Sequence, residues 1–140
     1  MVNFEFIEHT ADIGIRVRAT TLAELFQNTA CALFSIIIEI KPLKEIQKNI
    51  IVEAETLEDL LVFWLNELIS ILYTENFLPS EYVITIDDRE GQKLLNAVVS
   101  GQDFDPYSNK LDMEIKAATF HNLKIDHSED GYIVEVIFDT

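Results

Sequence analysis

Hydrophobic and polar positions follow two distinct periods along this chain of 140 residues. Apolar residues recur every three or four positions over 22–37 and again over 57–72, which is the spacing of amphipathic helices. Elsewhere apolar and polar residues alternate, as they do in half-buried strands. Alternating or short apolar stretches predict strands over 4–7, 13–18, 48–55, 82–87, 94–100, 113–118, 122–125 and 131–138. The pattern therefore predicts two helices among several short strands.

Local signals indicate where these elements begin and how they pack. Thr21 and Glu24 have capping-box spacing, and Thr56 precedes two acidic residues at the start of the second helix. The β-branched run 36–40 is compatible with either a last helical turn or a short strand. Trp64 is expected in the core. The run 132–138 is apolar on both faces except at Glu135, which predicts a central strand.

This element order predicts an α+β fold. Two helices separated by a strand, and flanked by hairpin-type strand pairs, favour a two-layer sandwich. Both helices are expected to pack on one face of a mixed, mostly antiparallel sheet. The length and the 49% hydrophobic composition are sufficient for one folded domain over residues 1–140.

Charge and cysteine content narrow the classes of partner. Ten Lys and Arg residues against 25 Asp and Glu residues leave a net charge of −15. This charge repels phosphate backbones and anionic lipids, so we expect no strong direct nucleic-acid binding and no membrane partner. The single cysteine, Cys31, excludes an intramolecular disulfide and is expected to be a small buried residue. No segment resembles a signal peptide or a transmembrane helix, and we expect a cytoplasmic protein.

The turn at 8–14, Glu-His-Thr-Ala-Asp-Ile-Gly, places polar side chains between two predicted strands. It carries an imidazole and a carboxylate, His9 and Asp12, at a position typical of functional loops. Asp139 and Thr140 directly follow the predicted central strand, and Asp12 joins them if that strand pairs with the first hairpin. Converging carboxylates repel one another, and a hard cation with oxygen ligands relieves the repulsion. The alternative is a solvated turn and a solvated chain end, and spacing alone does not decide between them.

Other groups of residues give weaker indications of chemistry. His9, His121 and His127 lack the helical spacing and the cysteine partners of a zinc site. Residues 103–105, Asp-Phe-Asp, begin like a calcium loop but lack its glycine and distal glutamate, which favours a solvated loop. Lys116 is either a salt-bridged surface lysine or a contact for a phosphate or an acidic partner. No phosphate loop, nucleophile elbow or acid–base pair suggests an enzyme.

Four segments together resemble the archease family. They are 8–14, Trp-Leu-Asn-Glu-Leu at 64–68, Glu-Ile-Lys-Ala-Ala-Thr-Phe-His at 114–121 and Ile-Phe-Asp-Thr at 137–140. The resemblance implies an archease-like fold over the whole chain and an accessory role beside the tRNA-splicing RNA ligase. In that role the protein is an activator and not an enzyme. It promotes the guanylylated-histidine intermediate of the ligase, sustains multiple turnover and broadens the nucleotides that the ligase accepts.

The resemblance also implies a divalent-cation site formed by Asp12, Asp139 and Thr140. Calcium is the expected ion, and magnesium or manganese would suit the same oxygen ligands. The chain departs from the family at Thr140, where relatives often carry an apolar residue, and at Phe120, where tyrosine is frequent.

Three further residues of the matching segments, His9, Lys116 and His121, are expected either to contact the ligase or to support the metal-binding turn. An acidic chain suits this accessory role, because it is a poor tRNA binder and is complementary to a basic RNA-binding enzyme.

Two other functions remain open from the sequence. A chaperone-like modulator of an RNA methyltransferase is also associated with this family, and binding to that enzyme in place of the ligase would indicate it. A metal-dependent enzyme is the other alternative, for which turnover of a phosphorylated substrate by the isolated protein would be the evidence.

Overall fold

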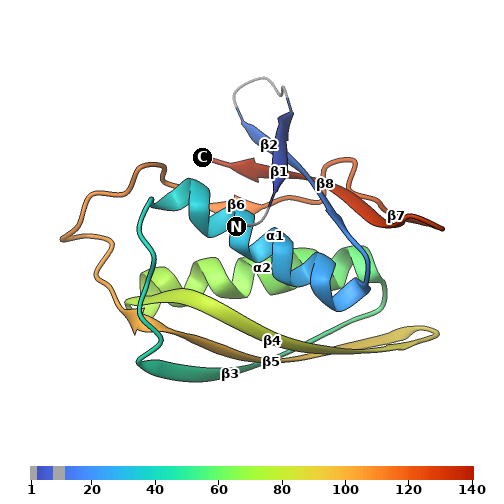
Figure 1. Cartoon of the computed structure of the whole chain (residues 1–140), viewed down its shortest axis with the longest axis horizontal. Helices are drawn as coiled ribbons and strands as arrows, with labels where there is room; N and C mark the ends of the chain where they lie inside the picture. Colours follow the sequence, from blue (N-terminus) through green and yellow to red (C-terminus); the bar gives the residue numbers. More distant parts are fainter. Residues whose placement is uncertain (1–2, 8–11) are drawn as a thin grey trace.

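The computed structural model describes residues 3–7 and 12–140, and these residues form two helices and eight strands (Figure 1). In chain order the elements are β1 (Phe4–Ile7), β2 (Ile13–Ala19), α1 (Leu22–Ile37), β3 (Ile46–Ala54), α2 (Leu57–Thr74), β4 (Phe77–Arg89), β5 (Gln92–Asp103), β6 (Ala117–Ala118), β7 (Ile125–Ser128) and β8 (Gly131–Asp139).

The strands form two sheets with the helices between them (Figure 1). One sheet has the order β1-β2-β8-β6, with β7 also paired to β8, and the other has the order β3-β5-β4. Each ladder between described strands is antiparallel. Helix α1 contacts β2, β8 and β4, whereas α2 contacts β6 and all three strands of the second sheet. Each helix therefore packs against both sheets.

The α+β class, and the packing of both helices against antiparallel sheets, are confirmed. The layering differs from the prediction, because the strands form two sheets and the helices are a middle layer instead of lying on one face of a single mixed sheet. The breadth of the apolar surface of α2 is the physical reason. At about 100° per residue, its buried positions cover roughly 200° of the helix circumference, which one sheet cannot cover. Val62 and Ile69 extend the buried surface beyond the predicted stripe.

Both helices begin at the threonines that the sequence indicates. Thr21 Oγ1 accepts a hydrogen bond from the Glu24 backbone N–H at 3.2 Å, and Thr56 Oγ1 accepts one from the Asp59 N–H at 3.1 Å. The reciprocal contact differs from a capping box, since Glu24 Oε1 accepts from the backbone N–H of Thr20 and not from that of Thr21. Helix α1 ends at Ile37.

The strand expected over 113–118 is reduced to β6, the two residues Ala117 and Ala118. The backbone N–H groups of Asp112 and Met113 both donate to the carbonyl of Ile37, at 2.9 and 3.2 Å, which fixes the start of this segment at the end of α1. Only the end of the segment reaches β8. The central position of β8 is confirmed, because it pairs with β2, β6 and β7.

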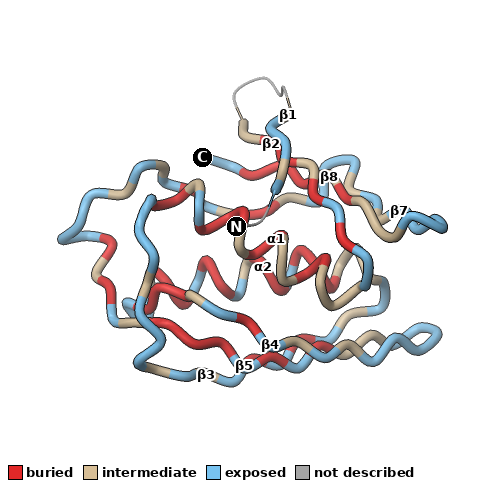
Figure 2. Tube along the Cα trace, viewed as in Figure 1, coloured by how far each residue is buried: buried red, intermediate tan, exposed pale blue. Residues whose placement is uncertain are grey.

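The core lies between the helix layer and the two sheets (Figure 2). Trp64 is fully buried there, as predicted, and its Nε1 donates to the carbonyl of Phe26 at 3.2 Å. This bond joins α2 to α1. Leu65 and Leu68 are also fully buried, so three of the five residues at 64–68 serve packing.

Candidate functional site at the ends of β2 and β8

The register between β2 and β8 brings two of the predicted carboxylates together. Ile13 lies opposite Phe138 in this antiparallel ladder. Asp12 directly precedes β2 and Asp139 is the last residue of β8, so extending this register by one residue places the two aspartates opposite each other. Asp12 is half-buried and Asp139 is exposed. The condition on which the sequence hypothesis depended, pairing of the last strand with the first hairpin, is met.

The segment around β6 holds Asp139 from the other side. Ala117 is the ladder partner of Asp139, and the backbone N–H of Lys116 donates to the Asp139 carbonyl at 2.9 Å. The backbone N–H and the hydroxyl of Thr119 donate to the carbonyl of Ile137, at 2.9 and 3.0 Å. The main chain at the end of β8 is therefore held by β2 on one side and by the β6 segment on the other.

The remaining predicted site residues lie in different surroundings. His9 lies outside the described residues. Lys116 is exposed and adjacent to Asp139 through its backbone, and Thr140 is exposed at the next position after Asp139. His121 lies in the turn after β6, where its backbone N–H donates to Thr119 Oγ1 at 3.3 Å. Three distant segments of the chain thus meet at this end of the first sheet.

The donor set fits a hard cation by its chemistry. Asp12 and Asp139 supply carboxylate oxygens, and Thr140 supplies further oxygen donors, which is the ligand type that calcium and magnesium accept. Among the described residues, no group of three or more His, Cys, Asp or Glu side chains is arranged to hold a metal ion. Any cation here would therefore depend on the two aspartates and on Thr140 together.

The Asp105 carboxylate, in the segment that begins like a calcium loop, is hydrogen-bonded within its own loop. It accepts hydrogen bonds from the Ser108 hydroxyl at 2.7 Å and from the Tyr107 backbone N–H at 2.9 Å. These bonds lower the pKa of the Asp105 carboxyl, with the Ser108 hydroxyl as the larger cause. Asp105 thus stabilises a turn in the loop after β5.

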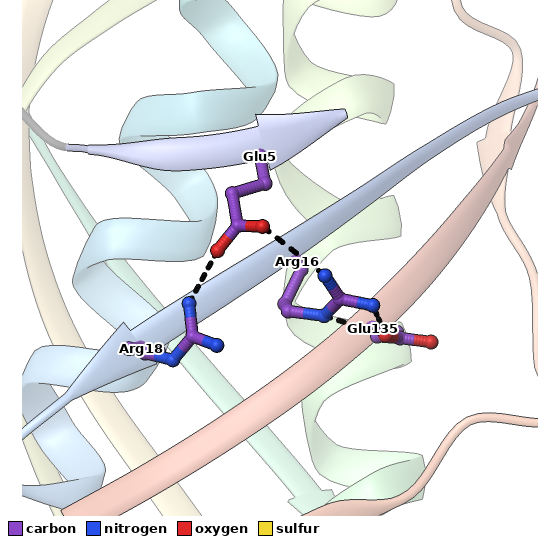
Figure 3. A network of polar contacts seen from close by, with 4 residues as sticks. All are labelled: Glu5, Arg16, Arg18 and Glu135. Atoms are coloured by element: carbon purple, nitrogen blue, oxygen red, sulfur yellow. Dashed lines mark hydrogen bonds and ion pairs between the residues drawn. The ribbon is translucent and has the colours of Figure 1, made fainter. Parts of the chain in front are cut away.

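A charged row crosses the outer face of the first sheet and was not anticipated from the sequence (Figure 3). Arg16 lies between Glu5 and Glu135 in the strand register. Its Nε donates to Glu135 Oε2 at 2.7 Å, and its Nη1 lies 3.1 Å from Glu5 Oε2. Arg18 also pairs with Glu5 and is the main cause that lowers the pKa of the Glu5 carboxyl. Glu135, the one polar residue of its strand run, was the available signal.

An open hollow of about 530 Å³ lies beside this row, between the β1–β2 hairpin and α1. Arg16, Arg18, Glu5 and Glu24 contribute balanced charges to its lining. Neither Asp12 nor Asp139 lines it, so the hollow is separate from the candidate site. Within residues 3–7 and 12–140, neither helix combines the length and the hydropathy needed to cross a membrane.

Comparison with known proteins gives consistent matches over nearly the full chain. The model of the archease protein family matches residues 4–140. The protein archease of Pyrococcus furiosus is 37% identical over 132 residues, covering 94% of this chain and 93% of the relative. That of Methanosarcina acetivorans is 35% identical over 138 residues, covering 97% and 94%.

Two solved structures share the fold. The solution structure of Methanobacterium thermoautotrophicum protein 1598 superimposes with a TM-score of 0.84 at 29% identity, covering 98% of each chain. The crystal structure of an archease from Thermotoga maritima, described as a possible chaperone, has a TM-score of 0.61 at 25% identity, covering 96% of this chain and 94% of that one. On the family match and these relatives, the chain belongs to the archease family.

Proposed function

We propose that this protein is an accessory activator of the tRNA-splicing RNA ligase. It promotes formation of the guanylylated-histidine intermediate of the ligase, sustains repeated turnover and broadens the nucleotides used. The observation that carries the proposal is the convergence of three segments at one end of the first sheet. Asp12 from the first hairpin, Asp139 from β8 and the backbone of Lys116 meet there, and these are three of the four segments that resemble archease.

In this proposal, Asp12, Asp139 and Thr140 would hold a divalent cation, with calcium as the proposed ion and magnesium or manganese as alternatives. The bound ion would supply positive charge at the surface that faces the ligase. The two carboxylates orient this end of the molecule toward the nucleotide and metal of the ligase. Lys116 and His121, which flank β6 on the exposed surface, are the proposed contacts to the partner, and His9 is a further one.

The overall charge supports a protein partner over a direct RNA partner. A net charge of −15 repels RNA and favours encounter with a basic surface, such as that of an RNA-binding enzyme. The same proposal places the protein in the cytoplasm. The reducing conditions there suit a chain whose one cysteine, Cys31, is a free thiol.

The test is guanylylation of the cognate ligase under multiple-turnover conditions, with this protein at substoichiometric concentration. We expect the wild type to give fast, recurring guanylylation, and we expect Asp12→Asn and Asp139→Asn each to reduce the stimulated rate at least about tenfold. Asp130→Asn is the matched control, because it makes the same charge change at the opposite end of β8. Wild-type stimulation by both site variants would remove the carboxylates from the mechanism, and no stimulation by the wild type would overturn the proposal.

A second candidate is a chaperone-like modulator of an RNA methyltransferase. It is favoured by the description of the Thermotoga maritima relative as a possible chaperone. Binding measurements with both purified enzymes separate the two functions. Submicromolar binding to the methyltransferase with none to the ligase would establish the second function in place of the first.

A further inference from the structure

The edge of β6 that faces away from β8 contacts a side chain of α2 instead of another strand. The inner edge of β6 pairs with β8 at two positions only, Ala117 with Asp139 and Ala118 with Phe138. In an antiparallel ladder, the N–H and C=O of one residue point to the same side, and consecutive residues alternate. The N–H of Thr119 points to β8, where it donates to Ile137. The polar groups of Ala118 therefore point away from β8, toward α2.

The side chain of Asn66 on α2 satisfies both of these groups. Its Oδ1 accepts a hydrogen bond from the Ala118 N–H at 2.7 Å, and its Nδ2 donates to the Ala118 carbonyl at 3.2 Å. One amide side chain thus makes the pair of bonds that a further strand would make. Ala118 is buried, so without Asn66 its N–H and C=O would lack these partners away from water.

The position of Asn66 is itself fixed by the core. It follows the fully buried Trp64 and Leu65 and precedes the exposed Glu67 in a helix of 18 residues, and it is itself half-buried. An amide on such an element can hold a short strand at a defined height above the helix. Two further contacts align the following segment along α2, namely the Phe63–Phe120 ring pair and the bond from the Ile125 N–H to Glu58 Oε2.

We propose that Asn66 is a positioning residue for the carboxylate end of β8. It holds Ala118, the segment around Ala118 holds the main chain of Ile137 and Asp139, and Asp139 thereby keeps its place beside Asp12. This role explains why an amide lies within the Trp-Leu-Asn-Glu-Leu segment, whose other described functions are packing and solvent exposure. The inference rests on the proposed function, because it concerns the cation affinity of that same site.

The first test is calcium binding to the full chain, measured by titration calorimetry with the metal alone. We expect Asn66→Ala to weaken calcium affinity about tenfold or more, because groups that orient metal ligands typically contribute factors of about 10 to 100. Glu67→Ala is the matched control on the neighbouring exposed position, and it should bind like the wild type. Asn66→Asp keeps the acceptor for the Ala118 N–H and loses the donor, so it should lie between the two.

A second measurement separates positioning from general stability. Hydrogen exchange of the Lys116 and Thr119 amides should be at least about tenfold faster in Asn66→Ala than in Glu67→Ala, while the amides of β5 remain unchanged. A variant with a lower melting temperature but wild-type calcium affinity and amide exchange would show that Asn66 only stabilises the fold, and would overturn the inference. If the wild type binds no calcium, the proposed cation site fails, and the exchange rates alone decide whether Asn66 positions β8.

Discussion

Gly14 shows how one residue without a side chain shapes the surface beside the candidate site. It lies in register between Ile7 on β1 and Ile137 on β8, two residues after Asp12 along the chain. A Cβ at this position would lie 2.3 Å from Ile7 Cγ1 and 2.9 Å from Ile137 Cδ1. The two isoleucine side chains therefore occupy the space above the glycine, and this close packing holds β1 and β8 together across β2.

We expect Gly14→Ala to lower the free energy of unfolding by about 1 to 3 kcal/mol, because an added methyl group in a filled site forces side chains to move. Urea denaturation measures the change. The double variant with Ile7→Ala should recover part of the loss, with a coupling of at least about 0.5 kcal/mol. Additive effects of the two substitutions would contradict the steric explanation.

Tyr82 is a titratable group within the core. Its ring meets Trp64 edge-on with centroids 6.0 Å apart, and the residue is 3% exposed. Burial raises the pKa of its hydroxyl well above the ordinary value of 10.0. The folded state therefore holds this proton more tightly than the unfolded chain does. The resulting stability is fully present below the ordinary pKa and is lost as the pH rises above it.

We expect the free energy of unfolding of the wild type to decline above about pH 10, and we expect the decline to be smaller in Tyr82→Phe. Urea denaturation at stepwise alkaline pH is the measurement. Burial also raises the pKa of Cys31, and the negative charge of that thiolate is a smaller cause of the raised pKa of Tyr82, so the difference between the two proteins reports Tyr82 together with its interaction with Cys31. Parallel pH profiles for the two proteins would show that ionisation of Tyr82 does not contribute.

At the scale of elements, local signals were sufficient to predict the helices. The threonines that cap α1 and α2 accept the expected backbone hydrogen bonds, and the apolar periods match both helices. Pairing between strands is a different kind of information, because it joins residues distant in sequence. Val83 and Val98 are ladder partners on the outer face of β3-β5-β4, yet both are exposed. Alternation in these strands is compatible with one sheet or two, so the second sheet could not be predicted.

The candidate site was predictable only in part, for the same reason. The sequence placed Asp139 at the end of a central strand and made its meeting with Asp12 conditional on the pairing of β2 with β8. The contribution of Asn66 could not be read from periodicity, since a polar residue beside an apolar stripe is expected to face water. The signal was its place next to Trp64 and Leu65, which fixes its side chain at the edge of the core. His9 remains a prediction, because it lies outside the described residues.

At the scale of the whole molecule, two electrostatic effects oppose each other. A net charge of −15 on a chain of this size repels itself in the folded state. Ion pairs such as Arg16 with Glu135 and Lys44 with Glu81 act in the other direction. These pairs are partly or largely exposed, and solvent screening leaves exposed ion pairs with only a small contribution to stability. The net repulsion is therefore expected to be the larger effect on stability.

We expect the melting temperature to rise by a few degrees between about 0.01 and 0.5 M sodium chloride, because salt shortens the range of the repulsion. The titration is done with a chelator present, so that binding of a divalent cation does not contribute. Affinity for a basic protein partner should change in the opposite direction and fall with salt, since screening weakens attraction between unlike surfaces. Salt concentration thus separates the effect of the net charge on folding stability from its effect on partner affinity. A melting temperature that falls with salt would mean that the ion pairs outweigh the net repulsion. The surface charge would then have to be explained by folding stability instead of by partner binding.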